Sequence, residues 1–261
     1  MENKKFSPTQ IIIIIGLIGL AFYLGFRSPG KKAEEELKPS ETVQNNQTQV
    51  PEVRIEDVKS AFNESQIKFG DDSKKVIFLE ISDPSCPYCS IASGYNNALN
   101  SQSGERFKLV EDGGTYVAPV REMKKLVESG EAAFAMIYRN GHGNGEVAMK
   151  ALYCANEQGK FWEAKALIFG AKGYDLINNT VKNDMTKTGL MADFLASVLD
   201  SKKMKTCLDG NQYKEQLVRD TNISGSLGVG GTPGFFVNEK MFSGAYSYTD
   251  MEASVNSALS N

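Results

Sequence analysis

Two cysteines separated by two residues carry the clearest chemistry in this sequence of 261 residues, in the order Cys86-Pro87-Tyr88-Cys89. Pro87 suits the first turn of a helix, where its missing N–H costs no hydrogen bond. A helix that begins here places Cys86 at its N-terminus, where free backbone N–H groups and the helix dipole stabilise a thiolate. Cys89 follows one turn later, shielded by the helix and close enough to form a disulfide with Cys86. The spacing predicts thiol–disulfide exchange in which Cys86 attacks and Cys89 resolves the mixed disulfide.

A short apolar segment precedes the pair and is expected to position it. Residues 76–81 are apolar apart from Glu80, a pattern that is typical of a central strand covered on both faces. Asp83 and Pro84 end this strand just before Cys86. Because a carboxyl buried in an apolar strand is hard to ionise, we expect a raised pKa for Glu80 and a role in proton transfer near Cys89. The alternative is an edge position in which Glu80 points to water.

Two other interpretations of the cysteine pair stay open. A zinc site needs two further thiolate or imidazole ligands, usually as a second close pair. The remaining candidates, Cys154, Cys207 and His142, are not closely spaced in the sequence. A purely structural disulfide of this spacing closes too small a loop to stabilise a domain of this size much. We therefore expect no metal and no cofactor besides the cysteines, and keep a metal-handling thiolate protein as the alternative from a different class.

The motif resembles the DsbA-like branch of the thioredoxin superfamily when it is taken together with Gly231-Thr232-Pro233 and the strand expected at residues 234–238. The resemblance covers about residues 64–259 and implies an α/β thioredoxin fold with an inserted helical subdomain. It also implies that Cys86 is the nucleophile and Cys89 its partner, that Pro233 is cis and faces the disulfide, and that Thr232 binds substrate backbone. Glu80 stands six residues before Cys86, where this family often has a carboxylate.

One departure from the family pattern concerns the direction of exchange. Tyr88 replaces the histidine that stands between the cysteines of the strongest oxidases, and this removes a positive partner for the Cys86 thiolate. The same Cys-Pro-Tyr-Cys order occurs in dimeric, isomerase-like relatives, which carry an N-terminal dimerisation domain. Here only a polar segment precedes the expected fold. This favours a monomeric oxidase, with a reductase or isomerase of the same fold as the alternative.

The N-terminal region predicts attachment to a membrane. A run without charges is bordered by Lys5 on one side and by Arg27 and Lys31 on the other, which is consistent with an uncleaved anchor. The residues after the run offer no small-x-small cleavage site of the kind that ends a signal peptide. We expect a cytoplasmic tail at 1–10, a transmembrane anchor at 11–27, a flexible linker at 28–52, and a domain at 53–261 with a helical insertion at about 143–225.

Cys154 and Cys207 lie within this expected insertion. We predict a structural disulfide between them, because two thiols in an exported domain are exposed to misoxidation. The alternative is two separately buried thiols. Apolar residues at helical spacing predict several helices around them, and one of the expected core faces contains Leu190, Phe194 and Val198.

Charge and chemistry together predict partners and compartment. A formal net charge of -3 and the absence of a long basic stretch give nucleic acid no electrostatic footprint. A disulfide donor works in an oxidising compartment, so we expect a single-pass protein of the cell membrane with its C-terminal domain outside the cytoplasm. The expected substrates are thiols of exported proteins. By resemblance to the family, an integral membrane quinone-linked oxidase restores the disulfide.

Overall fold

The computed structural model describes residues 52–210 and 212–260. The predicted tail and anchor lie outside these residues, as does the predicted linker apart from Glu52. Within the described ranges, no helix has the length and apolar character that a membrane crossing requires.

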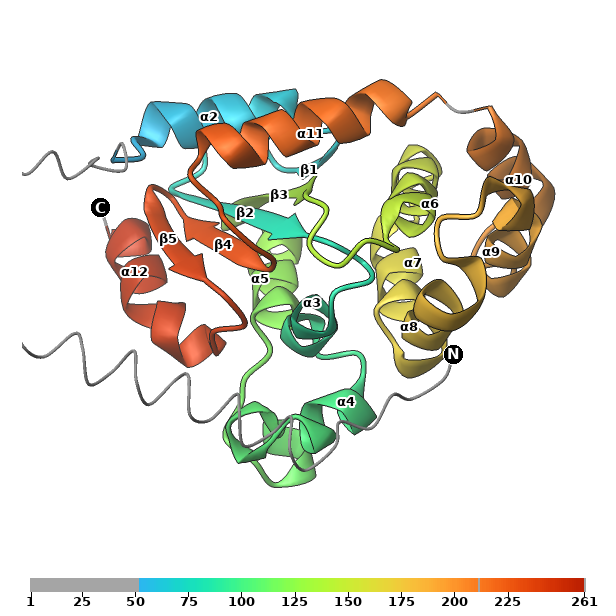
Figure 1. The fold of residues 1–261 in the computed structure, drawn as a ribbon. Helices are drawn as coiled ribbons and strands as arrows, with labels where there is room; N and C mark the ends of the chain where they lie inside the picture. Colours follow the sequence, from blue (N-terminus) through green and yellow to red (C-terminus); the bar gives the residue numbers. More distant parts are fainter. Residues whose placement is uncertain (1–51, 211, 261) are drawn as a thin grey trace, which may run out of the picture. The chain divides into compact units, whose positions relative to one another are not determined.

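A mixed sheet of five strands lies at the centre of the described domain (Figure 1), in the order β1-β3-β2-β4-β5. β2 and β3 are parallel, and the other neighbours are antiparallel. Every residue of β2 and β3 is buried, because helices cover both faces of the sheet. The strands are β1 (Ile67–Phe69), β2 (Val76–Ser82), β3 (Ala132–Tyr138), β4 (Gly234–Val237) and β5 (Lys240–Ser243).

The two faces of β2 contribute to different parts of the core. Ile77, Leu79 and Ile81 pack under helices α2 (Ile55–Glu64) and α11 (Lys214–Ser226), which lie side by side at the top of Figure 1. Val76 and Phe78 belong to the larger cluster on the other face, together with Cys89. Because side chains alternate along a strand, Glu80 points into the face that holds Cys89.

Helix α3 (Pro87–Ser93) starts the connection from β2 to β3. It ends at Gly94, whose φ of +73° is left-handed and where an added Cβ would lie 2.4 Å from the Cβ of Ala118. Glycine is therefore required at this corner. The connection continues through α4 (Asn97–Gln102), η1 (Glu105–Phe107), η2 (Val110–Asp112) and α5 (Pro119–Glu128), and a C-terminal helix, α12 (Tyr248–Ser260), follows the sheet.

A group of helices separates β3 from β4 and lies at one end of the sheet, on the right of Figure 1. The expected face of Leu190, Phe194 and Val198 is wrong in part: Leu190 is 47 % exposed, and the core residues of α9 are Met191 and Ala192. The reason is that α9 ends at Phe194 and does not continue to Val198. The elements before α11 are α6 (Glu146–Glu157), α7 (Phe161–Ile168), α8 (Ala171–Asp175), η3 (Leu176–Val181), η4 (Met185–Lys187), α9 (Thr188–Phe194) and α10 (Ser201–Asp209).

Cys154 of α6 and Cys207 of α10 are joined by a disulfide, with their Cα atoms 6.1 Å apart. The bond links residues 53 positions apart in the sequence, so it closes a large loop within the helical group. In the chain-entropy model, a loop of this length stabilises the folded state by about 4 kcal/mol.

We expect the double variant Cys154→Ala/Cys207→Ala to lose about 4 kcal/mol of unfolding free energy in denaturant titrations, because its unfolded chain is no longer cross-linked. A thiol count gives an independent check of the bond. In a Cys86→Ser/Cys89→Ser background, the denatured protein without reductant should show no free thiol. Two free thiols in that count would mean that Cys154 and Cys207 are unpaired.

Candidate active site

Cys86 occupies the N-cap position of α3, and Pro87 stands in the first turn. The Cys86 backbone N–H donates to the carbonyl of Asp83 at 3.0 Å, and the Cys86 carbonyl accepts from the N–H of Ser90 at 3.1 Å. Cys86 is 5 % exposed, whereas Cys89 is 1 % exposed, and both are free thiols. The sequence thus brings the two cysteines to one helix start, with Cys89 as the deeper of the pair.

The two thiols differ strongly in acidity. A hydrogen bond from the Cys89 thiol, assisted by the backbone N–H groups of Tyr88 and Cys89, lowers the pKa of Cys86 to about 6 in spite of its burial. Burial raises the pKa of Cys89 well above its ordinary value, and the hydrogen bond to Cys86 and the charge of Cys86 raise it further. At neutral pH Cys86 is therefore the thiolate, and Cys89 is a protonated thiol that supports it.

This difference predicts a pH-dependent stability of the reduced protein. Cys86 titrates at about 6 in the folded state and at about 8.5 in an unfolded chain. Between these values the unfolded state binds more protons, so the unfolding free energy rises with pH through this window and the stabilisation is lost as pH falls through 6. Denaturant titrations from pH 5 to 9 should show this slope for the reduced protein. The oxidised protein and a reduced Cys86→Ser variant should lack it, and an equal slope in all three would contradict the assignment.

The Thr232–Pro233 peptide bond is cis and lies beside Cys86. The Cys86 Sγ atom lies 3.4 Å from the Thr232 carbonyl oxygen, to which the thiol donates when it is protonated. Gly141 packs against Thr232 so closely that an added Cβ would lie 2.0 Å from the Thr232 Oγ1 atom. The structure thus brings Cys86 next to Thr232 and Pro233, which lie more than a hundred residues further along the chain.

Tyr88 projects from the site and is 50 % exposed. Its ring centroid lies 5.8 Å from that of Phe107. Phe107, Tyr116 and Tyr246 are among the residues that line a pocket of about 400 Å³ between η1 and the end of β5. The same pocket is also lined by the charged side chains of Arg106 and Asp250.

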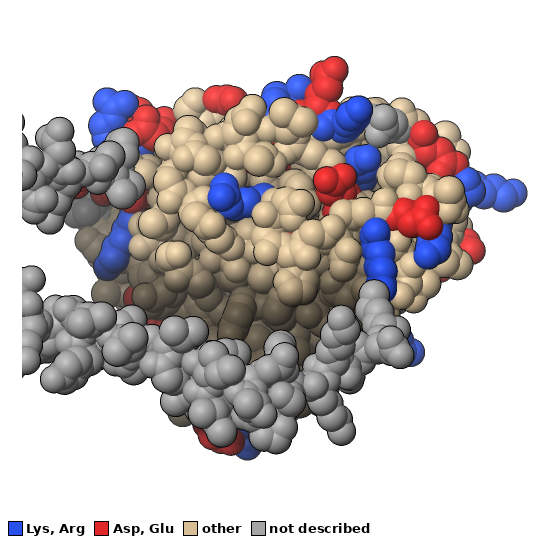
Figure 2. All heavy atoms as spheres, viewed as in Figure 1, with Lys and Arg blue, Asp and Glu red and all other residues tan. Residues whose placement is uncertain are grey.

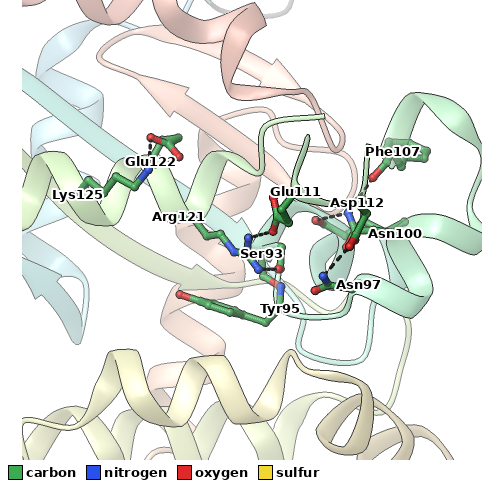
Figure 3. Close-up of polar contacts among 12 residues, drawn as sticks. Ser93, Tyr95, Asn97, Asn100, Phe107, Glu111, Asp112, Arg121, Glu122 and Lys125 are labelled. Atoms are coloured by element: carbon green, nitrogen blue, oxygen red, sulfur yellow. Dashed lines mark hydrogen bonds and ion pairs between the residues drawn. The ribbon is translucent and has the colours of Figure 1, made fainter. Parts of the chain in front are cut away.

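Phe107 lies in the segment between α3 and α5, and hydrogen bonds fix this segment in place (Figure 3). Asn100 donates to the carbonyls of Ile91 and Phe107 at 3.2 and 3.1 Å, which ties the segment to α3. The Arg121 guanidinium of α5 donates to the Gly94 carbonyl and pairs with Glu111. These contacts fix an aromatic surface next to Tyr88 that the sequence analysis did not predict.

Glu80 is buried, but its environment differs from the expected one. Its burial in an apolar strand was expected, but its ion-pair partner was not: Lys165 Nζ of α7 lies 2.8 Å from Glu80 Oε1, and the two side chains are 1 % exposed or less. Lys165 also contacts Met136 Sδ at 3.4 Å. Burial lowers the pKa of Lys165, while the charges of Glu80 and Cys89 act in the opposite direction. An ion pair therefore lies within electrostatic reach of the Cys89 sulfur.

Lys165 was missed, although the sequence contains a signal for it. It stands on the same helical stripe as Phe161, Ala164 and Ile168, at a position that must be buried. A charge on a core stripe needs an opposite charge close by. Glu80, a charge within a core strand, was the available partner.

Asp83 is the second residue that the sequence analysis undervalued, because it was treated only as the end of a strand. Its buried carboxylate accepts from the backbone N–H and hydroxyl of Ser85, at 2.8 and 2.7 Å, and from the N–H groups of Gly141 and His142, at 2.9 and 2.8 Å. Its own N–H lies 3.5 Å from Cys89 Sγ. Asp83 thus connects the loop before Cys86 to the loop after β3. An aspartate that is followed two residues later by a serine is typical of a turn in which the aspartate carboxylate accepts from the backbone. This spacing was the signal in the sequence for the role of Asp83.

Among the described residues, no group of three or more His, Cys, Asp and Glu side chains is placed to hold a metal ion. The curated proteins contain no match to the sequence. A family model described as thioredoxin matches residues 120–257, which is more than half of the chain. The matched segment includes Thr232 and Pro233 but starts after Cys86 and Cys89, so the placement of these two comes from the fold.

Solved structures resemble the whole described domain. BdbD from Bacillus subtilis in its oxidised form is 17 % identical, with a TM-score of 0.55 over 77 % of this chain and 95 % of that one. Alpha-DsbA1 from Wolbachia pipientis is 16 % identical, with a TM-score of 0.53 over 74 % of this chain and 90 % of that one. A variant of the same Wolbachia protein has a TM-score of 0.57 at 14 % identity, over 80 % and 96 % of the two chains. The chain belongs to the thioredoxin family, and its fold is that of the DsbA-like thiol–disulfide oxidoreductases.

Proposed function

We propose that this protein is a disulfide-donating oxidase that uses Cys86 and Cys89 to oxidise thiols of exported proteins. The observation that supports this most directly is the low pKa of Cys86, about 6, beside a deeply buried Cys89. A stabilised thiolate favours the reduced form of the pair, so the disulfide form gives up its bond readily. Such a pair is better suited to donate disulfides than to reduce them.

The proposed reaction has two exchanges. A substrate thiolate attacks Cys86 Sγ of the Cys86–Cys89 disulfide, and the Cys89 sulfur leaves and takes up a proton. A second substrate thiolate then attacks the substrate sulfur of the mixed disulfide, and Cys86 leaves as a thiolate. The substrate loses two electrons and gains a disulfide, while the enzyme becomes the dithiol. The low pKa of Cys86 accelerates the second exchange, because it makes Cys86 the better leaving group.

The surroundings of Cys86 suit a polypeptide substrate. The Thr232 backbone lies against the Cys86 sulfur, and the exposed Tyr88 ring and the adjoining pocket offer apolar contacts. The face drawn in Figure 2 is largely uncharged over the β4–β5 hairpin, and most charged side chains lie toward its edges. A polypeptide segment that binds there would have few charged groups to desolvate.

We place this activity outside the cytoplasm, on a monomer held at the membrane by residues 11–27. The disulfide between Cys154 and Cys207 supports an oxidising compartment. An integral membrane quinone-linked oxidase is the proposed partner that restores the Cys86–Cys89 disulfide. A reductase or isomerase is the competing role, and the absence of a histidine at position 88 is the feature that favours it.

Oxidative folding of reduced, denatured ribonuclease tests the proposed activity. The oxidised protein should restore ribonuclease activity in proportion to the amount added, because each molecule donates one disulfide. Ribonuclease that recovers no faster than in buffer would contradict the oxidase. Recovery that starts only from scrambled disulfides would support the isomerase instead.

A further inference from the structure

A set of asparagine side chains links the helical group to the loop before Cys86. The side-chain amide of Asn178 donates to the carbonyl of Ser85 at 3.2 Å and to that of Tyr174 at 3.1 Å. The Asn144 amide approaches Asn178 Oδ1 at 3.4 Å. Asn183 accepts from the N–H of Glu146 and donates to the Gly143 carbonyl, both at 2.8 Å. The helical group therefore contacts both loops that border the redox site.

The backbone around these asparagines departs from regular helix geometry. Asn178 lies in η3, a π-helix that spans Leu176–Val181. Lys182 and Asn183 follow with left-handed φ values of 48° and 62°. π-Helical turns and left-handed residues other than glycine cost free energy and concentrate at functional sites. Here they direct Asn178 and Asn183 toward the loops before α3 and after β3.

The peptide group between Ser85 and Cys86 is held in place by hydrogen bonds that involve Asn178 and Asp83. Ser85 donates its N–H and its hydroxyl to the Asp83 carboxylate, and the Ser85 hydroxyl accepts from the Asn144 N–H at 3.2 Å. The next N–H, that of Cys86, donates to the Asp83 carbonyl. The Ser85 carbonyl belongs to the same peptide group as the Cys86 N–H, and Asn178 is its hydrogen-bond partner. Without Asn178, this peptide group can tilt and carry Cys86 with it.

We propose that Asn178 is a positioning residue of the redox site, which fixes the Ser85–Cys86 peptide and so holds the Cys86 sulfur where the start of α3 stabilises its thiolate. The proposal rests on the exchange activity assigned to Cys86 and Cys89. In this proposal, the equilibrium between the dithiol and disulfide forms of Cys86 and Cys89 depends on a contact from the helical group. Tyr174, whose carbonyl also accepts from Asn178, has a pKa that is raised by burial and further by the charge of Cys86.

The test compares Asn178→Ala with Asn179→Ala in the full-length protein. Asn179 is the next residue of the same π-helix and is exposed, and its side-chain amide donates to Asp175 on the helix surface, so its loss is a matched control. The pKa of Cys86 is read from ultraviolet thiolate absorbance, and the equilibrium constant with glutathione from the ratio of reduced to oxidised protein. Losing one hydrogen bond should raise the pKa of Cys86. It should also shift the glutathione equilibrium toward the oxidised form of the protein by about three- to tenfold.

The expected result is a shift in both quantities for Asn178→Ala and none for Asn179→Ala. A folded Asn178→Ala protein with the wild-type pKa and equilibrium constant would overturn the proposal, as would equal shifts in both variants. If Asn178→Ala does not fold, Asn178→Ser removes the same amide while keeping a small polar side chain, and it is judged by the same criteria. Failure of the proposed function looks different, because wild-type protein would then fail to oxidise ribonuclease while the Cys86 pKa still reports on Asn178.

Discussion

A Cys86→Ser variant is expected to lose disulfide exchange to the background level, whereas Cys89→Ser is expected to accumulate mixed disulfides with its substrates. The reason is the difference between the two sulfurs. Cys86 has a pKa of about 6 and contacts the Thr232 carbonyl at the edge of the site. Cys89 is buried, and its pKa is raised well above the ordinary value. Only Cys86 can form a mixed disulfide with a substrate, and Cys89 is the thiol that attacks this mixed disulfide and frees the substrate.

Non-reducing electrophoresis of extracts from cells that produce each variant measures this. The Cys89→Ser lane should contain reductant-sensitive adducts, and the Cys86→Ser lane should contain none. The double variant Cys86→Ser/Cys89→Ser is the control for adducts formed through other cysteines. Adducts in the Cys86→Ser lane and none in the Cys89→Ser lane would reverse the two roles.

The second large effect is expected at the buried ion pair beneath Cys89. Lys165→Met leaves the Glu80 carboxylate uncompensated in the core, and Glu80→Gln leaves the Lys165 ammonium uncompensated. Removing one partner of a buried pair costs about 3–5 kcal/mol, because the other charge stays away from water. We therefore expect each single variant to lose that much unfolding free energy in denaturant titrations at pH 7.

The double variant Glu80→Gln/Lys165→Met separates this explanation from a loss of packing. With both charges gone, no uncompensated charge remains, so much of the lost stability should return. Lys160→Met is the matched control, because Lys160 forms an exposed pair with Glu163 at 2.8 Å near the start of the same helix. Its removal should cost less than about 1 kcal/mol. Additive losses in the double variant would show that the pair is not coupled.

The parts of the fold that the sequence predicted are those specified by local chemistry. The apolar run before Asp83 and Pro84 forms β2. Pro87 defines the start of α3, and the run from Thr232 to Asn238 contains the cis peptide bond and β4. A short stretch of residues is enough to predict β2 and the start of α3, whereas the cis bond at Pro233 was implied by the resemblance to the DsbA-like family.

The parts that were missed depend on contacts between distant segments. Glu80 and Lys165 are 85 positions apart, so the pair exists only after α7 packs against the sheet. The four hydrogen bonds to Asp83 come from two loops, and Asn178 reaches Ser85 across 93 positions. Leu190 was misplaced because its helix is shorter than the apolar spacing suggested. Periodicity within one segment contains no information about such partners.

The redox potential of the Cys86–Cys89 pair tests the central claim most directly, and equilibration of the purified protein with glutathione measures it. The start of α3 and the Cys89 thiol stabilise the Cys86 thiolate, while Tyr88 adds no positive charge. We therefore expect a value of about −130 to −200 mV, between that of the strongest oxidases, about −120 mV, and that of thioredoxin. A value near that of thioredoxin, about −270 mV, would contradict the oxidase and favour a reductase.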